Sequence, residues 1–156
     1  LEKGLMKIHL NGTQKTELFT SKNGFTDDRV TALIQPDSSH LIIGTDHSSA
    51  FRMDIRKNKF EKITLTNDIL SNSVNALAGN EKEIWIATKN GVFKLDAEAK
   101  LIKQYNTETG LTHNNINHIF LDKTNTLWVA THSNFITSIA PNGTLKNKKI
   151  YSAIIH

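Results

Sequence analysis

The sequence contains no cysteine, two prolines and only three arginines among its 156 residues. The lack of cysteine excludes disulfides, thiolate zinc sites and cysteine nucleophiles, but it does not settle the compartment. No apolar run approaches the ~18 residues that a membrane-spanning helix needs. No charged segment followed by an apolar one opens the chain, as it would in a signal peptide. Because the chain begins with Leu1 in mid-pattern, we expect it to be a processed piece of a longer protein.

Positive charge is only in modest excess. Nineteen lysines and arginines against fifteen acidic residues give a net charge of +4. The lysines are spread along the chain, and no basic stripe with interleaved aromatic residues, typical of a nucleic-acid surface, is present. We therefore expect no nucleic-acid partner. A hydrophobic content of 38% is ordinary for a globular protein and is sufficient for a core.

One repeated segment organises the chain. Its clearest copy is GLTHNNINHIFLDKTNTLWVAT at residues 110–131, and ILSNSVNALAGNEKEIWIAT and GFTDDRVTALIQPDSSHLIIGT precede it. The closing threonines of the three copies, Thr45, Thr88 and Thr131, lie 43 residues apart. Short strands repeating every 40–45 residues are typical of the blades of a β-propeller.

Each repeat predicts four short strands and no helix. The apolar run at 84–87 suits a strand that is covered on both faces. The Asn-Gly pairs at 11–12 and 142–143 predict tight turns, and we prefer this to their reading as glycosylation sites. The strands are expected at residues 4–10 and 16–20, then at 30–34, 41–45, 51–55 and 60–65, at 74–78, 84–88, 92–95 and 101–105, and at 116–121, 127–131, 135–139 and 150–153.

The fold class is therefore all-β, a β-propeller fragment of about three and a half four-stranded blades in one domain. The expected half blade is residues 1–23, and the blades are residues 24–67, 68–109 and 110–156. Closed propellers have ~4 to 8 blades, and an open arc leaves strand edges bare. We expect a homodimer, since two copies supply the strands of seven blades, or association with the remaining blades of a parent chain.

The segment at 110–131 resembles the two-component regulator propeller repeat. That pattern runs Gly-Leu, small polar residues, a strand that starts in Val or Ile, an acidic turn, and Leu-Trp-Ile-Gly-Thr. The matching residues are Gly110, Leu111, Ile116, Asp122, Leu127, Trp128 and Thr131, then Leu70, Asn72, Val74, Ile84, Trp85 and Thr88, and in the first copy Gly24, Val30, Gly44 and Thr45. Ile42 stands where tryptophan is expected, and Ala87 and Ala130 replace the glycine of the family. The closing dipeptide of the Trp-Asp repeat and the kelch Gly-Gly signature are absent.

The resemblance implies a periplasmic sensor region of an inner-membrane histidine kinase or hybrid two-component regulator. It also implies recognition of a nutrient, such as a glycan fragment. A protein–protein interaction or dimerisation module without a small-molecule ligand is one alternative. A metal-dependent propeller lyase is another.

Loops on one face of the propeller are the expected binding site. In a blade, the loop between the second and third strands lies on the same face as the loop that enters the next blade. Loops on a rigid scaffold are common positions for binding residues. For a small-molecule or oligosaccharide ligand, the candidates are Arg29, Asp46, His47, Lys89, Asn90, His113 and His132, in loops that also hold Asp27, Asp28, Asn72, Asn114 and Asn134. Each of these residues is also typical of a turn that faces water.

Catalysis is the less favoured interpretation. The sequence has no Ser–His–Asp order, no suitably spaced carboxylate pair and no phosphate-binding glycine loop. His47 and His132 occupy equivalent loops, but two histidines are too few for a metal site. We expect no catalytic residue, metal or cofactor. Trp85 and Trp128 are expected to pack between blades.

Overall fold

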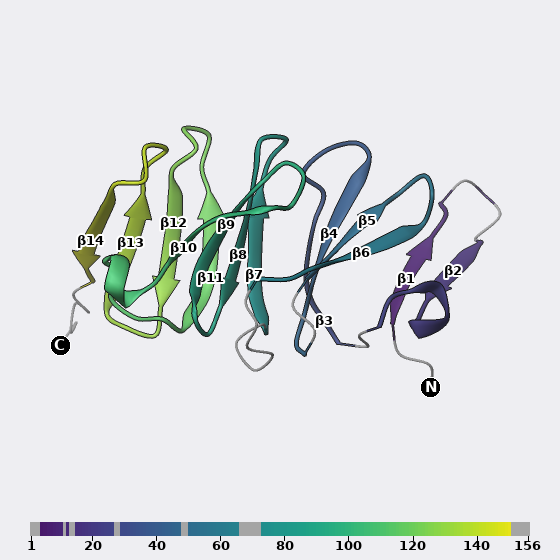
Figure 1. Cartoon of the computed structure of the whole chain (residues 1–156), viewed down its shortest axis with the longest axis horizontal. Coiled ribbons are helices and arrows are strands. Elements are labelled where there is room, and N and C mark those ends of the chain that lie inside the picture. The colour runs from purple at the N-terminus through teal and green to yellow at the C-terminus, as the bar shows by residue number, and fades with distance from the viewer. Residues whose placement is uncertain are drawn as a thin grey trace.

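The structure, a computed structural model, describes residues 4–10, 12, 15–26, 29–47, 50–65 and 73–150. Its sheets stand side by side in a row, with β1 and β2 at one end and β14 at the other (Figure 1). The strands of these residues are β1 (Leu5–Ile8), β2 (Thr16–Phe19), β3 (Val30–Ile34), β4 (His40–Thr45), β5 (Ala50–Asp54), β6 (Lys59–Ile63), β7 (Val74–Gly79), β8 (Glu83–Thr88), β9 (Gly91–Asp96), β10 (Leu101–Tyr105), β11 (Ile116–Leu121), β12 (Leu127–Thr131), β13 (Phe135–Ile139) and β14 (Leu145–Lys149).

The strands form three four-stranded antiparallel sheets and one two-stranded sheet. We call β3–β6 the first blade, β7–β10 the second, β11–β14 the third, and β1–β2 the half blade. Within each blade, consecutive strands are neighbours. The blades touch chiefly through their first strands, β3, β7 and β11, which are therefore the inner strands. The predicted fragment of three and a half blades is confirmed, although the expected boundary between residues 67 and 68 lies outside the described residues.

Apolar side chains fill the spaces between blades. Ile42 of the first blade packs in one cluster with Ile84 and Phe93 of the second. Trp85 of the second blade packs with Ile116 of the third in another cluster. Each face of the second blade is thus covered by a neighbour. This explains the nearly continuous apolar sequence of β8, which is buried from its second residue onward.

The fourth strand of the third blade was predicted at 150–153, of which residues 151–153 lie outside the described residues. The position is wrong, because the strand that pairs with β13 comes earlier in the chain. The strand is β14, Leu145–Lys149. The turn at Asn142 and Gly143 closes tightly, with the Ala140 N–H donating to the Thr144 carbonyl at 2.9 Å, so pairing resumes at once. Four of the five residues of β14 are exposed. An outer strand needs few apolar residues. A prediction based on hydrophobicity therefore placed this strand too late in the chain.

The Gly-Leu pair that opens the repeat ends a short 3-10 helix. Gly110 has a φ of 111°, in the left-handed region that favours glycine, and it caps the helix at Thr107–Thr109. The chain then turns so that Leu111 is buried against the second and third blades. Gly24 and the buried Phe25 repeat this arrangement in the first blade. The pair therefore anchors the entry of each of these two blades.

The two tryptophans of the repeat have different environments. Trp85 is 2% exposed and packs between the second and third blades, as predicted. Trp128 is 44% exposed, which contradicts the predicted burial between blades. The physical reason is that, among the described residues, no further sheet lies on that face of the third blade.

Candidate ligand-binding face

The candidate face is built from loops whose backbones are tied to each other. The Asp46 N–H donates to the carbonyl of Arg29 at 3.0 Å, which joins the β4–β5 loop to the segment that enters the first blade. The equivalent bond in the third blade runs from the His132 N–H to the Asn115 carbonyl at 3.2 Å. The loops are therefore held in the same arrangement in both blades, and their exposed side chains start from a defined backbone.

The closing threonines of the second and third repeats support these loops from inside. Thr88 is buried, and its hydroxyl accepts a hydrogen bond from the Asn90 N–H at 2.9 Å and donates to the Gly91 carbonyl at 3.2 Å. Thr131 has the same place in the third blade, where its hydroxyl accepts from the Ser133 N–H at 3.2 Å. The repeated threonine therefore shapes the β-turn, and its hydroxyl is not offered to a ligand.

Each inner strand begins at this face with an irregularity. The register of pairing shifts after Val30, Val74 and Ile116, at the same place in each blade. Such bulges change the direction of a strand, and they are often found next to binding sites. Asn75, at the second of them, donates from its side-chain amide to the Ile116 carbonyl at 2.7 Å. The bulge thereby joins the second blade to the third.

Asp46 connects the first blade to the second. Its carboxylate contacts Arg29, with Nη1 to Oδ2 at 3.2 Å, and accepts a hydrogen bond from the hydroxyl of Ser73 at 2.9 Å. The Arg29 side chain is 60% exposed, so the ion pair contributes at most about 1 kcal/mol to stability. Both oxygens of Asp46 are engaged within the chain, which gives this residue a structural role at the candidate face.

The two histidines of the third blade lie together. The ring centres of His113 and His132 are 6.4 Å apart, and both residues are exposed. The Asn115 N–H donates to His113 Nδ1 at 2.9 Å. A neutral ring at this position therefore carries its proton on Nε2 and can donate it to a ligand.

The second blade contributes Lys89 and Asn90, whose side chains are exposed. The Gly91 N–H donates to the Asn114 carbonyl at 2.7 Å, so the loop that enters the third blade lies against the β8–β9 turn. The structure thus pairs Arg29 with Asp46 and His113 with His132. Asp27, Asp28 and Asn72 lie outside the described residues.

The chemistry of this face is that of hydrogen bonding and charge. Among the residues that the structure describes, no group of three or more His, Asp or Glu side chains is arranged to hold a metal ion. Cavities formed by the described residues lie elsewhere, among them one at the opposite end of the first blade and others on the side of the third blade that faces away from the second. The sequence reasoning missed the first of these, although the isoleucine at position 42 was its signal.

Comparison with known proteins agrees with the repeat. Residues 110–133 match the family described as two component regulator propeller. A comparison with curated proteins found no match. In the part of the chain that the structure describes, no helix is long and apolar enough to cross a membrane.

Solved structures share the propeller fold of this chain. An extracellular domain assigned to a hybrid two-component system of B. thetaiotaomicron has a TM-score of 0.74 at 20% identity, covering 96% of this chain and 22% of that domain. A second such domain has a TM-score of 0.69 at 20% identity, with coverage of 85% and 20%. Streptogramin B lyase has a TM-score of 0.71 at 21% identity, with coverage of 92% and 47%. The chain thus spans about a fifth of the two extracellular domains, and at these identities the likeness establishes the propeller fold.

Proposed function

We propose that the chain is part of the extracytoplasmic sensor region of a two-component signalling receptor and that it recognises a ligand without transforming it. The observation that carries the proposal is the match of residues 110–133 to the regulator propeller family. The fold it shares with extracellular domains assigned to hybrid two-component systems supports the same role. A periplasmic location and a histidine kinase output belong to this proposal.

The binding site we propose is the candidate face. Arg29, Lys89, His113 and His132 carry hydrogen-bond donors on loops that backbone bonds hold in place. Hydroxyl-rich ligands such as glycan fragments offer many acceptors to a polar, pre-ordered surface of this kind. Such a ligand acts as a signal only if it binds one arrangement of the receptor more tightly than another. A ligand with equal affinity for both arrangements does not change their populations.

The test is a titration of the chain with a panel of neutral and acidic oligosaccharides, followed by NMR of the histidine rings. We expect the resonances of His113 and His132 to shift together and to saturate. His132→Ala is expected to weaken binding at least tenfold. His118→Ala is the control, because His118 is also exposed but lies on β11, away from the loops. Equal effects of the two substitutions would refute the proposed site.

A second candidate function is docking of another protein surface. The side of the third blade that faces away from the second exposes Phe120 and Trp128, and two cavities lined by Trp128 and Ile136 lie on it. In the second blade the corresponding side is covered by a neighbouring blade. We propose that the occupant is a further sheet of the same kind.

A further inference from the structure

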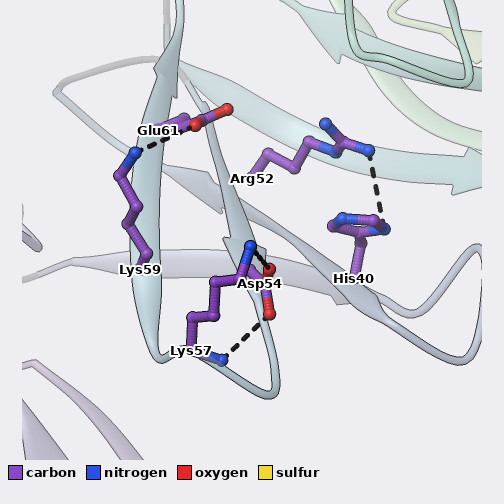
Figure 2. Close-up of a pocket in the computed structure, with 6 residues that line it drawn as sticks. All are labelled: His40, Arg52, Asp54, Lys57, Lys59 and Glu61. Carbon is purple, nitrogen blue, oxygen red and sulfur yellow. Dashed lines mark hydrogen bonds and ion pairs between the residues drawn. The ribbon is translucent and has the colours of Figure 1, made fainter.

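A polar cavity lies in the first blade, at the end opposite the candidate face. It has a volume of about 160 Å³ and is lined by His40, Arg52, Asp54, Lys57, Lys59 and Glu61. Figure 2 shows Arg52 reaching towards His40, with the Lys57–Asp54 and Lys59–Glu61 contacts on the other side. These residues come from β4, β5, β6 and the turn between β5 and β6.

The cavity follows from the position of Arg52 in the sheet. Arg52 pairs with Ile42 on one side and with Glu61 on the other. Ile42 is fully buried against the second blade, so this row of side chains faces the second blade. Burial falls along the row, from the buried Ile42 through the half-buried Arg52 to the exposed Glu61. Arg52 therefore lies where the space between the two blades opens outwards.

The second blade fills the equivalent position from its own sequence. Lys94 pairs with Trp85 as Arg52 pairs with Ile42. The Lys94 ammonium lies 2.6 Å from Glu83 Oε2 and 5.0 Å from the centre of the Trp85 ring. The indole N–H also donates to the Glu83 carboxylate, at 3.1 Å. A cation, a carboxylate and an aromatic ring thus form a closed group, in which both ion-pair side chains are largely buried.

The first blade keeps the cation and loses both of its partners. Ile42 replaces the tryptophan, and His40, two residues earlier, replaces the glutamate. The smaller isoleucine leaves space, and the histidine supplies no negative charge. The Nε–H of Arg52 is buried and has no hydrogen-bond partner among the described residues. A buried donor without a partner is costly, so it marks a place that a further acceptor would stabilise.

His40 is not an adequate partner for this guanidinium. Its Nδ1 lies 3.0 Å from Asp37 Oδ2 but 3.5 Å from Arg52 Nη2. Partial burial raises the pKa of Asp37, but hydrogen bonds from the Ser39 N–H and from His40 outweigh it and lower the pKa below its ordinary value. The ionised carboxylate of Asp37 holds the Nδ1 proton of His40, so this nitrogen cannot accept from Arg52.

The two carboxylates that line the cavity are engaged elsewhere. Asp54 Oδ1 accepts the N–H groups of Arg56 and Lys57 in the turn, and its Oδ2 lies 3.6 Å from the Lys57 ammonium. Glu61 pairs with Lys59 at 3.5 Å. The spare hydrogen-bonding capacity of the cavity is therefore that of the Arg52 guanidinium, which binds carboxylates through parallel N–H bonds.

We propose that this cavity binds a small carboxylate ligand, whose carboxylate takes the place that Glu83 occupies in the second blade. The ligand accepts from the Arg52 guanidinium, and the cations of the lining (Arg52, Lys57 and Lys59) outnumber its carboxylates (Asp54 and Glu61). The volume admits a carboxylate with a few further atoms but not an oligosaccharide. The site is separate from the candidate face and does not depend on the sensor function proposed above.

Acetate tests the proposal, read through the side-chain Nε–H resonances of the arginines. With three arginines in the chain, each signal is assigned by one substitution. Sodium acetate replaces sodium chloride at constant ionic strength and pH. We expect the Arg52 signal to shift and saturate, while the signal of Arg56, on the same hairpin and exposed, does not. Equal or unsaturable shifts of the two signals would overturn the site.

His40→Glu provides the decisive variant. It restores to the first blade the carboxylate that Glu83 supplies in the second, so Arg52 gains a partner from within the chain. We expect acetate binding to weaken at least tenfold and the melting temperature to rise. Arg52→Gln should abolish acetate binding. Arg56→Gln removes the same charge outside the cavity and should leave acetate binding unchanged. Undiminished binding by the His40→Glu variant would contradict the proposal.

Discussion

Asp122 shows how much a single side chain organises at the turn of the third blade. One carboxylate oxygen accepts from the Thr124 hydroxyl at 2.6 Å and from the N–H groups of Thr124 and Thr126. The other accepts from the indole N–H of Trp128 at 2.8 Å. These bonds, that of the Thr124 hydroxyl first, hold the pKa of Asp122 at about 2, because they favour the ionised form.

The titration of Asp122 is therefore displaced to low pH. Its folded pKa lies below the ordinary value of 3.8, so its stabilising contribution is complete above about pH 4 and is lost as the pH falls towards about 2. We expect the Trp128 indole N–H resonance to follow this transition, with a midpoint near pH 2. Asp122→Asn should abolish the transition. A midpoint near pH 4 in the unsubstituted chain would contradict the hydrogen-bonded arrangement.

Two glycines of the repeat differ in what surrounds them. Gly91 and Gly110 both have positive φ, 108° and 111°. A Cβ on Gly91 would overlap the carbonyl oxygen of Tyr105, whereas on Gly110 it would make an ordinary contact with Leu145 at 3.6 Å. We expect Gly110→Ala to lower the free energy of unfolding by about 1–2 kcal/mol, because alanine disfavours the left-handed backbone. Gly91→Ala should lower it by the same amount and by about 1–3 kcal/mol more, because the new Cβ is overpacked. Urea unfolding of the two variants measures the difference, and equal costs would contradict it.

At the scale of the strand, the same residue of the repeat has two energetic roles. Trp85 is enclosed between blades, while Trp128 lies on the uncovered side of the third blade. Trp85→Ala should destabilise the chain by about 3–5 kcal/mol, as expected for an enclosed aromatic residue. Trp128→Ala should cost less than about 1 kcal/mol in the monomer. Denaturation at low protein concentration compares them, and a similar loss in both would mean that Trp128 is covered in solution.

The strands that the sequence predicted well are those with an apolar face. The runs around Trp85 and Val129 leave no choice of register, because a shift by one residue would turn buried side chains towards water. β14 has no such constraint, because its sequence is rich in lysine and has no apolar face that would predict a strand. The loop residues were placed by the repeat, yet the engagement of Asp46 with Ser73 depends on how neighbouring blades meet. No sequence pattern at position 46 specifies that contact.

The cavity at Arg52 illustrates the same limit. The departure of Ile42 from the repeat was visible in the sequence, but its consequence was not. That consequence depends on a cross-strand partner ten residues away, and on the Glu83–Lys94 pair of another blade. Arg52 and the Glu83–Lys94 pair occupy equivalent places in two blades, and this equivalence is defined only by the strand pairing.

For the whole molecule, the uncovered side of the third blade is the dominant feature. Phe120 is 61% exposed beside Trp128, and a cavity bounded by Trp128, Ile136 and Ile150 opens on that side. The equivalent side of the second blade is closed by the third, which buries Trp85 almost completely. Exposed apolar surface of this kind, on the end of a row of stacked sheets, is typical of an interface.

We therefore predict that the isolated chain self-associates, with a second copy supplying the sheet that covers Trp128. Sedimentation should give a mass that rises from monomer to dimer with concentration. Trp128→Glu should hold the chain as a monomer, because it puts a charge into the contact. Ile102→Glu is the control, since Ile102 is exposed on β10, the outer strand of the second blade. If the unsubstituted chain stays a monomer at every concentration, or both variants dissociate it equally, the third blade is not the contact.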